Sequence, residues 1–242
     1  PVTGMENILR TLKRRFPNPG AMELGDPYRT IVGVALSART RDEQVLKLLP
    51  GLFDAFPTME ALSDATVAQI TAKIDTIGMF RQKAKNLSGL AKRCVERHGG
   101  LVPSTMEELV ELPGVGRKTA SVVLACCFQT PSIAVDTHVH RVTNRLGWVR
   151  TKTPEKTEAA LLRIVPVRAM RLVNQVFVKL GRYVCLPGKP RCWACPVRKE
   201  CAFKNKNLVA PKDADAIIAD IVRREDALET QRLAVAYGKH RS

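Results

Sequence analysis

The chain has 242 residues, of which 45% are apolar and 26% are charged, so it can bury a sizeable core in one large domain or two small ones. Its 39 Lys and Arg residues against 23 Asp and Glu give a formal net charge of +16, which indicates a polyanionic partner such as nucleic acid or an anionic membrane surface. The longest apolar run, Val122–Phe128, is far shorter than the roughly 18 residues of a membrane span, which excludes a transmembrane helix.

The pattern along the chain is helical. Asp26 followed by Pro27 is typical of a helix N-terminus, and it precedes the apolar stretch Ile31–Leu36. Apolar residues then recur at the spacing of one helix face, and cap and stop signals bound further segments. These segments are Val45–Leu52, Met59–Leu62, Val67–Ile74, Arg81–Arg97, Thr105–Leu112 (begun by a capping box of Ser104 and Glu107), a helix from Thr153-Pro154, and Met170–Gly181. Alternation typical of strands is nearly absent, so the sequence predicts an all-α fold of about ten helices.

A glycine-rich turn interrupts this pattern at Leu112-Pro-Gly-Val-Gly-Arg-Lys-Thr-Ala120. Gly114 and Gly116 allow a tight turn with positive φ, after which a new helix begins at about Gly116. Without side chains at the two glycines, the free N–H groups at this helix start can approach a phosphate oxygen, aided by the positive end of the helix dipole and by Arg117. A purely structural turn is the alternative.

Lys118 lies in the first turn of that helix, where the dipole and Arg117 both disfavour a protonated ammonium. The helix then runs about 15 Å away, and the extended segment Gln129–Val135 is long enough to bring Asp136 back toward Lys118. An amine and a carboxylate brought together in this way suit nucleophilic catalysis. The alternatives are an exposed lysine without a role and an aspartate that only caps the next helix.

The second half of the chain is the more basic. Fourteen Lys and Arg residues between Thr137 and Lys199 face only two acidic residues, Glu155 and Glu158, within that window. This charge run predicts a folded basic surface that follows phosphates, with a merely solvated face as the alternative. Beyond Cys201 the chain becomes polar and then places an apolar stripe on a predicted C-terminal helix, made of Ile217, Ile218, Ile221, Val222 and Leu228. We expect the stripe to dock on the body of the protein; a partner-binding helix is the alternative.

Four of the seven cysteines are close together in the sequence, at Cys185, Cys192, Cys195 and Cys201. No export segment is visible, so we expect a reducing cytosol, where such a group indicates a metal site and not disulfides. Zinc and an iron–sulfur cluster both accept four thiolates, and the residues alone do not decide between them. The remaining three cysteines, Cys94, Cys126 and Cys127, lie in apolar helical contexts and are expected to be buried.

The run Leu112–Ala120 together with Val135-Asp-Thr-His138 resembles the helix–hairpin–helix superfamily of base-excision DNA glycosylases, and within it the endonuclease III family. The resemblance covers about residues 5–203. It implies two helical lobes, a helical-barrel domain over 21–129 that contains the hairpin and a cluster domain formed by 1–20 plus 130–205. Residues 206–242 would be a helical C-terminal extension. DNA would lie across a cleft between the lobes.

The same resemblance assigns roles to residues. Lys118 would be the nucleophile and Asp136 would assist it, and the cysteine spacing matches the family's [4Fe–4S] pattern. Lys189 and Arg191, between the first two cysteines, would then reach DNA phosphates.

Two further positions depart from the family pattern: Arg39 stands where a glutamine is usual, and Met79 stands where a leucine wedge is usual. Met79 should still fill the gap left by a flipped nucleotide, and Arg39 would change the preference for the opposite base or bind a phosphate instead.

The resemblance implies a bifunctional DNA glycosylase and AP lyase that removes oxidised pyrimidines from double-stranded DNA. We expect it to act as a monomer in a prokaryotic cytoplasm, associated with the nucleoid and not with a membrane. The alternatives are a narrow-specificity or mismatch glycosylase with weak lyase activity and a non-enzymatic, zinc-containing DNA-binding module. The sequence does not identify the preferred lesion.

Overall fold

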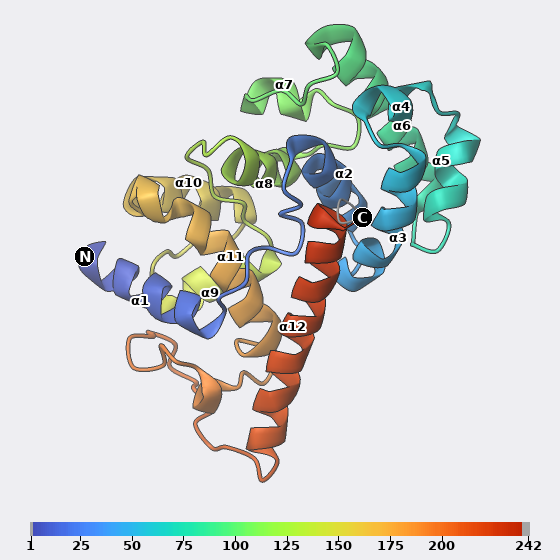
Figure 1. The fold of residues 1–242 in the computed structure, drawn as a ribbon. Coiled ribbons are helices and arrows are strands. Elements are labelled where there is room, and N and C mark those ends of the chain that lie inside the picture. The colour runs from blue at the N-terminus through green and yellow to red at the C-terminus, as the bar shows by residue number, and fades with distance from the viewer. Residues whose placement is uncertain (1, 239–242) are drawn as a thin grey trace. The chain divides into compact units, whose positions relative to one another are not determined.

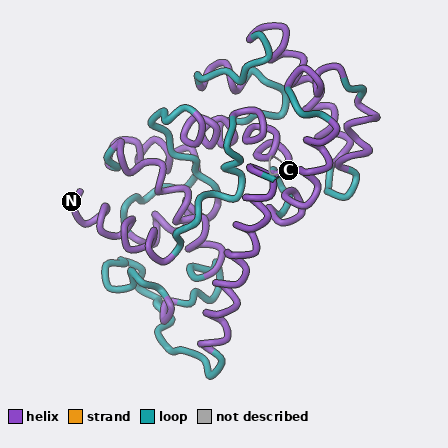
Figure 2. Tube along the Cα trace, in the orientation of Figure 1, coloured by secondary structure: helices purple, strands orange, loops and turns teal. Residues whose placement is uncertain are grey.

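The structure is a computed structural model that describes residues 2–238; residue 1 and residues 239–242, which belong to the predicted cluster domain and C-terminal extension, lie outside it. The described residues form twelve α-helices and one short 3₁₀-helix joined by loops, with no strand among them (Figure 2). The prediction of an all-α fold is therefore confirmed. None of the described helices is both long and apolar enough to cross a membrane.

The chain divides into two compact units, which are described separately. The first, here the hairpin unit, comprises Ala21–Thr130 and Ala227–Ser242. Its helices are α2 (Pro27–Ser37), α3 (Asp42–Ala55), α4 (Met59–Asp64), α5 (Val67–Ile74), α6 (Phe80–His98), α7 (Met106–Val110), α8 (Arg117–Cys127) and the second half of α12 (Ala214–Tyr237). Helix α6 packs against α4 and α5, and α8 packs against α2 and α7 (Figure 1). One apolar core holds these helices together.

In the hairpin unit the predicted start of α2 is confirmed, whereas the predicted start of α7 is displaced. Asp26 caps α2, its Oδ1 accepting a hydrogen bond of 2.8 Å from the backbone N–H of Arg29. Helix α7 is instead capped by Thr105, whose hydroxyl accepts from the N–H of Glu108, so the capping box predicted at Ser104 and Glu107 is wrong by one residue. Two overlapping Ser/Thr-x-x-Glu pairs occur here, and the structure uses the one that brings Leu109 fully into the core.

The second unit, here the cysteine unit, comprises Pro1–Gly20 and Pro131–Asp226. Its elements are α1 (Val2–Arg15), α9 (Thr137–Leu146), α10 (Pro154–Ile164), α11 (Val167–Tyr183), the 3₁₀-helix η1 (Cys192–Ala194) and the first half of α12. Helix α11 packs against α9 and α1. The contact with α9 is close at Gly181, where an added Cβ would lie 2.7 Å from the Cβ of His138.

Helix α12 buries a narrower stripe than the sequence predicts. Ile221, Leu228 and Val235, spaced seven residues apart, are buried, whereas Ile218 and Val222 are exposed. The predicted apolar face is therefore wrong at those two positions. The reason is that the buried stripe also contains charged side chains, Glu225 and Arg232, four residues after Ile221 and Leu228. A search for apolar residues alone cannot find such a face.

A buried ion pair connects α12 to α11 within the cysteine unit. The ammonium of Lys179 lies 2.6 Å from a carboxylate oxygen of Glu225, and both side chains are only 9% exposed. Lys179 also donates a 2.9 Å hydrogen bond to the carbonyl of Asn18, which follows α1. Since neither charge is well solvated, each depends on the other.

We expect Glu225→Ala to destabilise the protein by about 3 kcal/mol, because it leaves the ammonium of Lys179 buried without a counter-ion. The free energy of unfolding in urea, followed by circular dichroism, measures the loss. Asp220→Ala on the same helix is the matched control: Asp220 pairs with the exposed Arg223 and Arg224, and its removal should leave the midpoint unchanged within error. Equal effects of the two substitutions would contradict the assignment.

Candidate nucleic-acid interface and cysteine pocket

The glycine-rich turn of the hairpin unit is formed between α7 and α8. Gly114 has φ +78°, and a Cβ there would lie 2.8 Å from the side chain of Asn86, so both its conformation and its surroundings require glycine. Gly116 is different: its φ is −89°, and a Cβ would meet no atom within 4 Å. The prediction of positive φ at both glycines is therefore correct for Gly114 and wrong for Gly116. Among the residues that the structure describes, none comes close enough to demand a glycine at position 116.

Helix α8 begins without a side-chain cap because its N-cap residue is Gly116. Its first two residues, Arg117 and Lys118, are exposed, while Thr119 and Ala120 are buried against the core. The exposed helix start thus combines backbone N–H groups, the positive end of the dipole and two basic side chains. Such a surface suits an anionic ligand.

Arg39 lies in a tight turn at the end of α2. Ala38 has φ −57° and ψ 116°, Arg39 has φ 57°, and the N–H of Thr40 donates to the carbonyl of Ser37 at 3.1 Å. These values describe a type II turn with arginine at the position that usually requires glycine. Arg39 is exposed, so the strain is not relieved by packing of its side chain.

Met79 is also held in the left-handed region, with φ 59° and ψ 24°, immediately before α6. Its side chain is 56% exposed, whereas Ile77 in the same loop is buried. A large apolar side chain that is exposed on strained backbone is costly in water. Arg39, Met79 and Gln129, at the start of the segment Gln129–Val135, are the three non-glycine residues of positive φ in the described part of the hairpin unit.

Asp136 caps α9 in the cysteine unit, and its Oδ1 accepts a 2.8 Å hydrogen bond from the N–H of Val139. The side chain is half-buried. The capping function inferred from the sequence is therefore present, and the approach of Asp136 to Lys118 stays a prediction.

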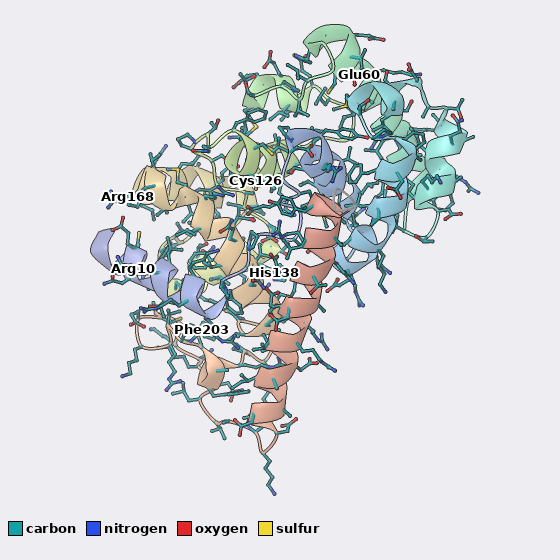
Figure 3. The ribbon with its side chains drawn as sticks, viewed as in Figure 1. Arg10, Glu60, Cys126, His138, Arg168 and Phe203 are labelled. Carbon is teal, nitrogen blue, oxygen red and sulfur yellow. The ribbon has the colours of Figure 1, made fainter. Side chains whose placement is uncertain are left out.

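The two histidines of α9, His138 and His140, face different surroundings. His138 contacts Arg141 and lies against Gly181 of α11, and burial lowers its pKa even though Asp136 opposes the shift (Figure 3). His140 instead meets the hydroxyl of Thr157. The two rings therefore point to different neighbours, as residues two apart on a helix do.

All four clustered cysteines line one pocket of the cysteine unit. Apolar side chains of α9 and α11 line it as well, together with Phe203 and three basic side chains, Arg145, Arg198 and Lys206. Burial, together with the nearby thiols of Cys185, Cys192 and Cys201, raises the pKa of Cys195 to about 12. Within residues 2–238 no group of three or more His, Cys, Asp or Glu side chains is arranged to hold a metal ion directly.

Two arginines of α9, Arg141 and Arg145, donate hydrogen bonds to the loop on one side of the pocket. Arg145 donates to the carbonyls of Leu186 and Pro187 at 2.7 and 2.6 Å and reaches the Sγ of Cys185 at 3.4 Å. Its guanidinium also lies 4.6 Å from the ring centre of Phe203 (Figure 3). Arg141 donates to the carbonyl of Cys185 at 2.9 Å. These contacts bring positive charge and hydrogen-bond donors to the loop that carries the thiols.

The predicted basic surface is therefore smaller than the sequence suggests. Arg141, Arg145 and Lys179 turn inward, and Arg168 pairs with Glu6 at 2.6 Å (Figure 3). The charge count between Thr137 and Lys199 did not include the acidic partners, because Glu6 and Glu225 lie outside that part of the sequence.

The two cations of the cysteine loop differ in their surroundings. Lys189 is exposed, and Arg191 is half-buried and donates to the carbonyl of Tyr183 at 3.0 Å.

The remaining three cysteines lie outside this pocket, in the hairpin unit, and were expected to be buried. Cys94 is fully buried in the core of the hairpin unit, and burial raises the pKa of its thiol to about 11. Cys126, also in Figure 3, and Cys127 are half-buried. The expectation of burial is thus confirmed for Cys94 and only partly correct for the other two.

Residues 32–167 match the HhH-GPD superfamily of base excision DNA repair proteins. The chain belongs to this superfamily. It is 42% identical over 199 residues to endonuclease III of Thermotoga maritima, covering 82% of this chain and 92% of the relative. Endonuclease III of Escherichia coli is 36% identical, with 82% and 95% covered. A solved structure of a trapped endonuclease III–DNA covalent intermediate with an estranged adenine superposes with a TM-score of 0.74 at 34% identity, covering 82% of this chain and 94% of that one.

Membership of this family confirms the predicted fold and the predicted activity. The chain is a base excision repair DNA glycosylase of the endonuclease III type, with AP lyase activity. The family therefore decides against a non-enzymatic DNA-binding module.

Sequence reasoning missed one residue of the hairpin unit, Lys83 of α6. Its side chain is only 7% exposed, and its ammonium donates to the carbonyl of Leu36 in the last turn of α2 and to the hydroxyl of Thr40 after that helix. A signal was available, because Lys83 shares one helix face with Leu87, Leu90 and Cys94, all of which are buried. A lysine on the apolar face of an amphipathic helix needs a partner.

The two glycines should respond differently to alanine. We expect Gly114→Ala to cost about 2 kcal/mol, because alanine is strained at positive φ and its Cβ meets Asn86. Gly116→Ala should change stability by less than about 0.5 kcal/mol, since its Cβ points into open space. Urea unfolding of both variants measures the difference, and a larger loss for Gly116→Ala would contradict the geometry.

Proposed function

We propose that this glycosylase removes oxidised pyrimidines from double-stranded DNA through Lys118, assisted by Asp136. The observation that carries the proposal is an exposed lysine in the first turn of a helix whose N-cap is a glycine with open space around it. A glycine that the fold itself does not require is explained by a ligand that approaches the backbone. A DNA phosphate next to the damaged nucleotide is such a ligand.

The chemistry follows from the residue types. The neutral amine of Lys118 attacks C1′ of the damaged nucleotide, and the base leaves with the electron pair of the glycosidic bond. Loss of a proton from the nitrogen and opening of the sugar ring give a Schiff base. The imine acidifies a C2′ hydrogen, so β-elimination breaks the C3′–O bond and cuts the strand on the 3′ side. The carboxylate of Asp136 stabilises positive charge that develops at C1′ and accepts a proton from the amine.

Access to C1′ requires that the damaged nucleotide leave the helix stack and that the gap be filled. We infer that Met79 enters the gap and that Arg39 faces the orphaned base. Exposure and left-handed backbone at both positions support this, because strain on exposed side chains is typical of functional loops. An arginine donates but does not accept hydrogen bonds, so it favours guanine-type acceptors on the opposite base. A narrower substrate range than that of a glutamine-bearing relative is the second candidate function.

We further propose that Cys185, Cys192, Cys195 and Cys201 hold a [4Fe–4S] cluster. The donor set fits, because four thiols share one pocket, and burial raises the pKa of Cys195 and Cys201, so these two need the positive charge of a metal group to become thiolates. The cluster would stabilise the loop that carries Lys189 and Arg191 toward DNA phosphates. The enzyme would act as a monomer on damaged or abasic duplex DNA.

Lys118→Gln should abolish the covalent adduct that borohydride traps between enzyme and an abasic duplex, because glutamine cannot form a Schiff base. The readout is a shifted band on a denaturing gel. Lys92→Gln, at an exposed lysine on α6, is the matched control and should trap as the wild type does. A full-strength adduct from Lys118→Gln would remove Lys118 from the reaction.

Elemental analysis of the purified protein should give about four irons per chain together with labile sulfide and a brown colour. Cys192→Ser should lose the colour and most of the iron, because three thiolates remain. Cys94→Ser, outside the pocket, is the control and should retain the iron. Zinc in place of iron would overturn the cluster and leave the glycosylase chemistry untouched.

A further inference from the structure

Lys83 is a buried cation without an acidic partner. Its side chain is 7% exposed, and the ammonium donates to the carbonyl of Leu36 at 2.8 Å and to the hydroxyl of Thr40. Among the described residues, no carboxylate lies within ion-pair distance of it. Burial lowers its pKa, which reflects the cost of keeping this charge away from water. A lysine held at such a cost by two neutral oxygens calls for an explanation.

The two oxygens belong to the segment that carries Arg39. Leu36 lies in the last turn of α2, and Thr40 closes the type II turn in which Arg39 has positive φ. The ammonium therefore bonds to the residue just before the turn, Leu36, and to the last residue of the turn, Thr40. A hydrogen bond at each end opposes relaxation of the turn to a conformation that arginine prefers.

The same residue is bonded to the segment that carries Met79. The backbone N–H of Lys83 donates to the carbonyl of Met79 at 3.0 Å, in the first turn of α6. Met79 is thus fixed at the helix start by the main chain of Lys83, while Arg39 is fixed by its side chain. The two loops are far apart in the sequence and share this one residue.

We propose that Lys83 is a positioning residue that couples the Arg39 turn to the Met79 loop, so that both side chains enter the DNA duplex as one preorganised element. This rests on the proposed function, in which Met79 fills the gap and Arg39 faces the orphaned base. Coupling matters because each loop alone would have to be ordered when DNA binds, and the ordering cost would weaken extrusion of the nucleotide. Lysine suits the task since its flexible stem reaches from α6 to α2 and its ammonium donates in several directions.

The test separates extrusion from chemistry by using two DNA substrates. A single-stranded abasic oligonucleotide offers C1′ to Lys118 with no gap to fill, whereas a duplex with 2-aminopurine opposite the abasic site requires filling. Fluorescence of 2-aminopurine rises when the base loses its stacking, so it reports on estrangement directly. The measurements are borohydride trapping on both substrates and the fluorescence rise on the duplex.

Lys83→Met keeps the length of the side chain and removes its charge and donors. We expect trapping on the single strand within about twofold of wild type, and trapping and fluorescence rise on the duplex lowered by about tenfold. Thr40→Val, in the half-buried loop, removes one acceptor without emptying the core and should lower the duplex signals by about threefold. Lys85→Met, at an exposed lysine of the same helix, is the control for loss of one positive charge and should match wild type.

Each outcome decides the proposal. Duplex signals of wild-type strength in both Lys83→Met and Thr40→Val would overturn the coupling while leaving Lys118 in place. An equal loss on single strand and duplex would also overturn it, since Lys83 would then support only the fold. If Lys83→Met does not fold, Thr40→Val alone decides by the same ratio. Absence of any adduct with the wild-type enzyme would instead reject the proposed function, and the coupling with it.

Discussion

The candidate residues of this protein lie at helix ends, where the chain leaves backbone groups unpaired, whereas backbone groups within a helix are already paired. This constraint organises the candidate residues of both units. Lys118 is in the first turn of α8, Met79 precedes α6, Arg39 follows α2, and Asp136 caps α9. At each of these ends the chain leaves four N–H or C=O groups to be satisfied from outside the helix. The way in which each end is satisfied determines what it can bind.

These helix ends differ in which group forms hydrogen bonds with their unpaired backbone atoms. At α9 the chain supplies it, since the carboxylate of Asp136 caps the helix. At the end of α2 the partner comes from another helix, through the ammonium of Lys83 on the carbonyl of Leu36. At α8 the N-cap is Gly116, which has no side chain to offer, and the helix start is exposed. The start of α8 is therefore exposed and has no side-chain cap, which distinguishes it from the end of α2 and the start of α9.

Much of this arrangement could be read from the sequence, and the failures share a cause. Cap signals and apolar spacing predicted the helices because both depend on residues within one turn of each other. The left-handed backbone of Arg39 and Met79 could not be predicted, since neither residue type favours positive φ and the support comes from elsewhere in the fold. The buried face of α12 was misplaced for the same reason: Glu225 is buried because Lys179 of α11 pairs with it. Sequence patterns within one element therefore give a wrong prediction where a residue from elsewhere in the chain stabilises a backbone conformation or a burial that the residue type does not favour.

The same argument limits what net charge says about DNA binding. The chain carries +16, and the basic window first suggested a continuous phosphate-binding surface. Arg141 and Arg145 instead direct their donors to the cysteine loop, and Lys83 is enclosed by α2 and α6. Counterion release depends only on cations that reach phosphates, so the salt dependence of DNA binding should be weaker than the total charge implies. Under the proposed function the inward cations would act on DNA indirectly, because they hold the loops that would present Lys189 and Arg39. Some cations of this protein are therefore free to contact a ligand, whereas others hold segments of the chain in place. The number of basic residues in the sequence does not distinguish these two groups, and the three-dimensional structure does.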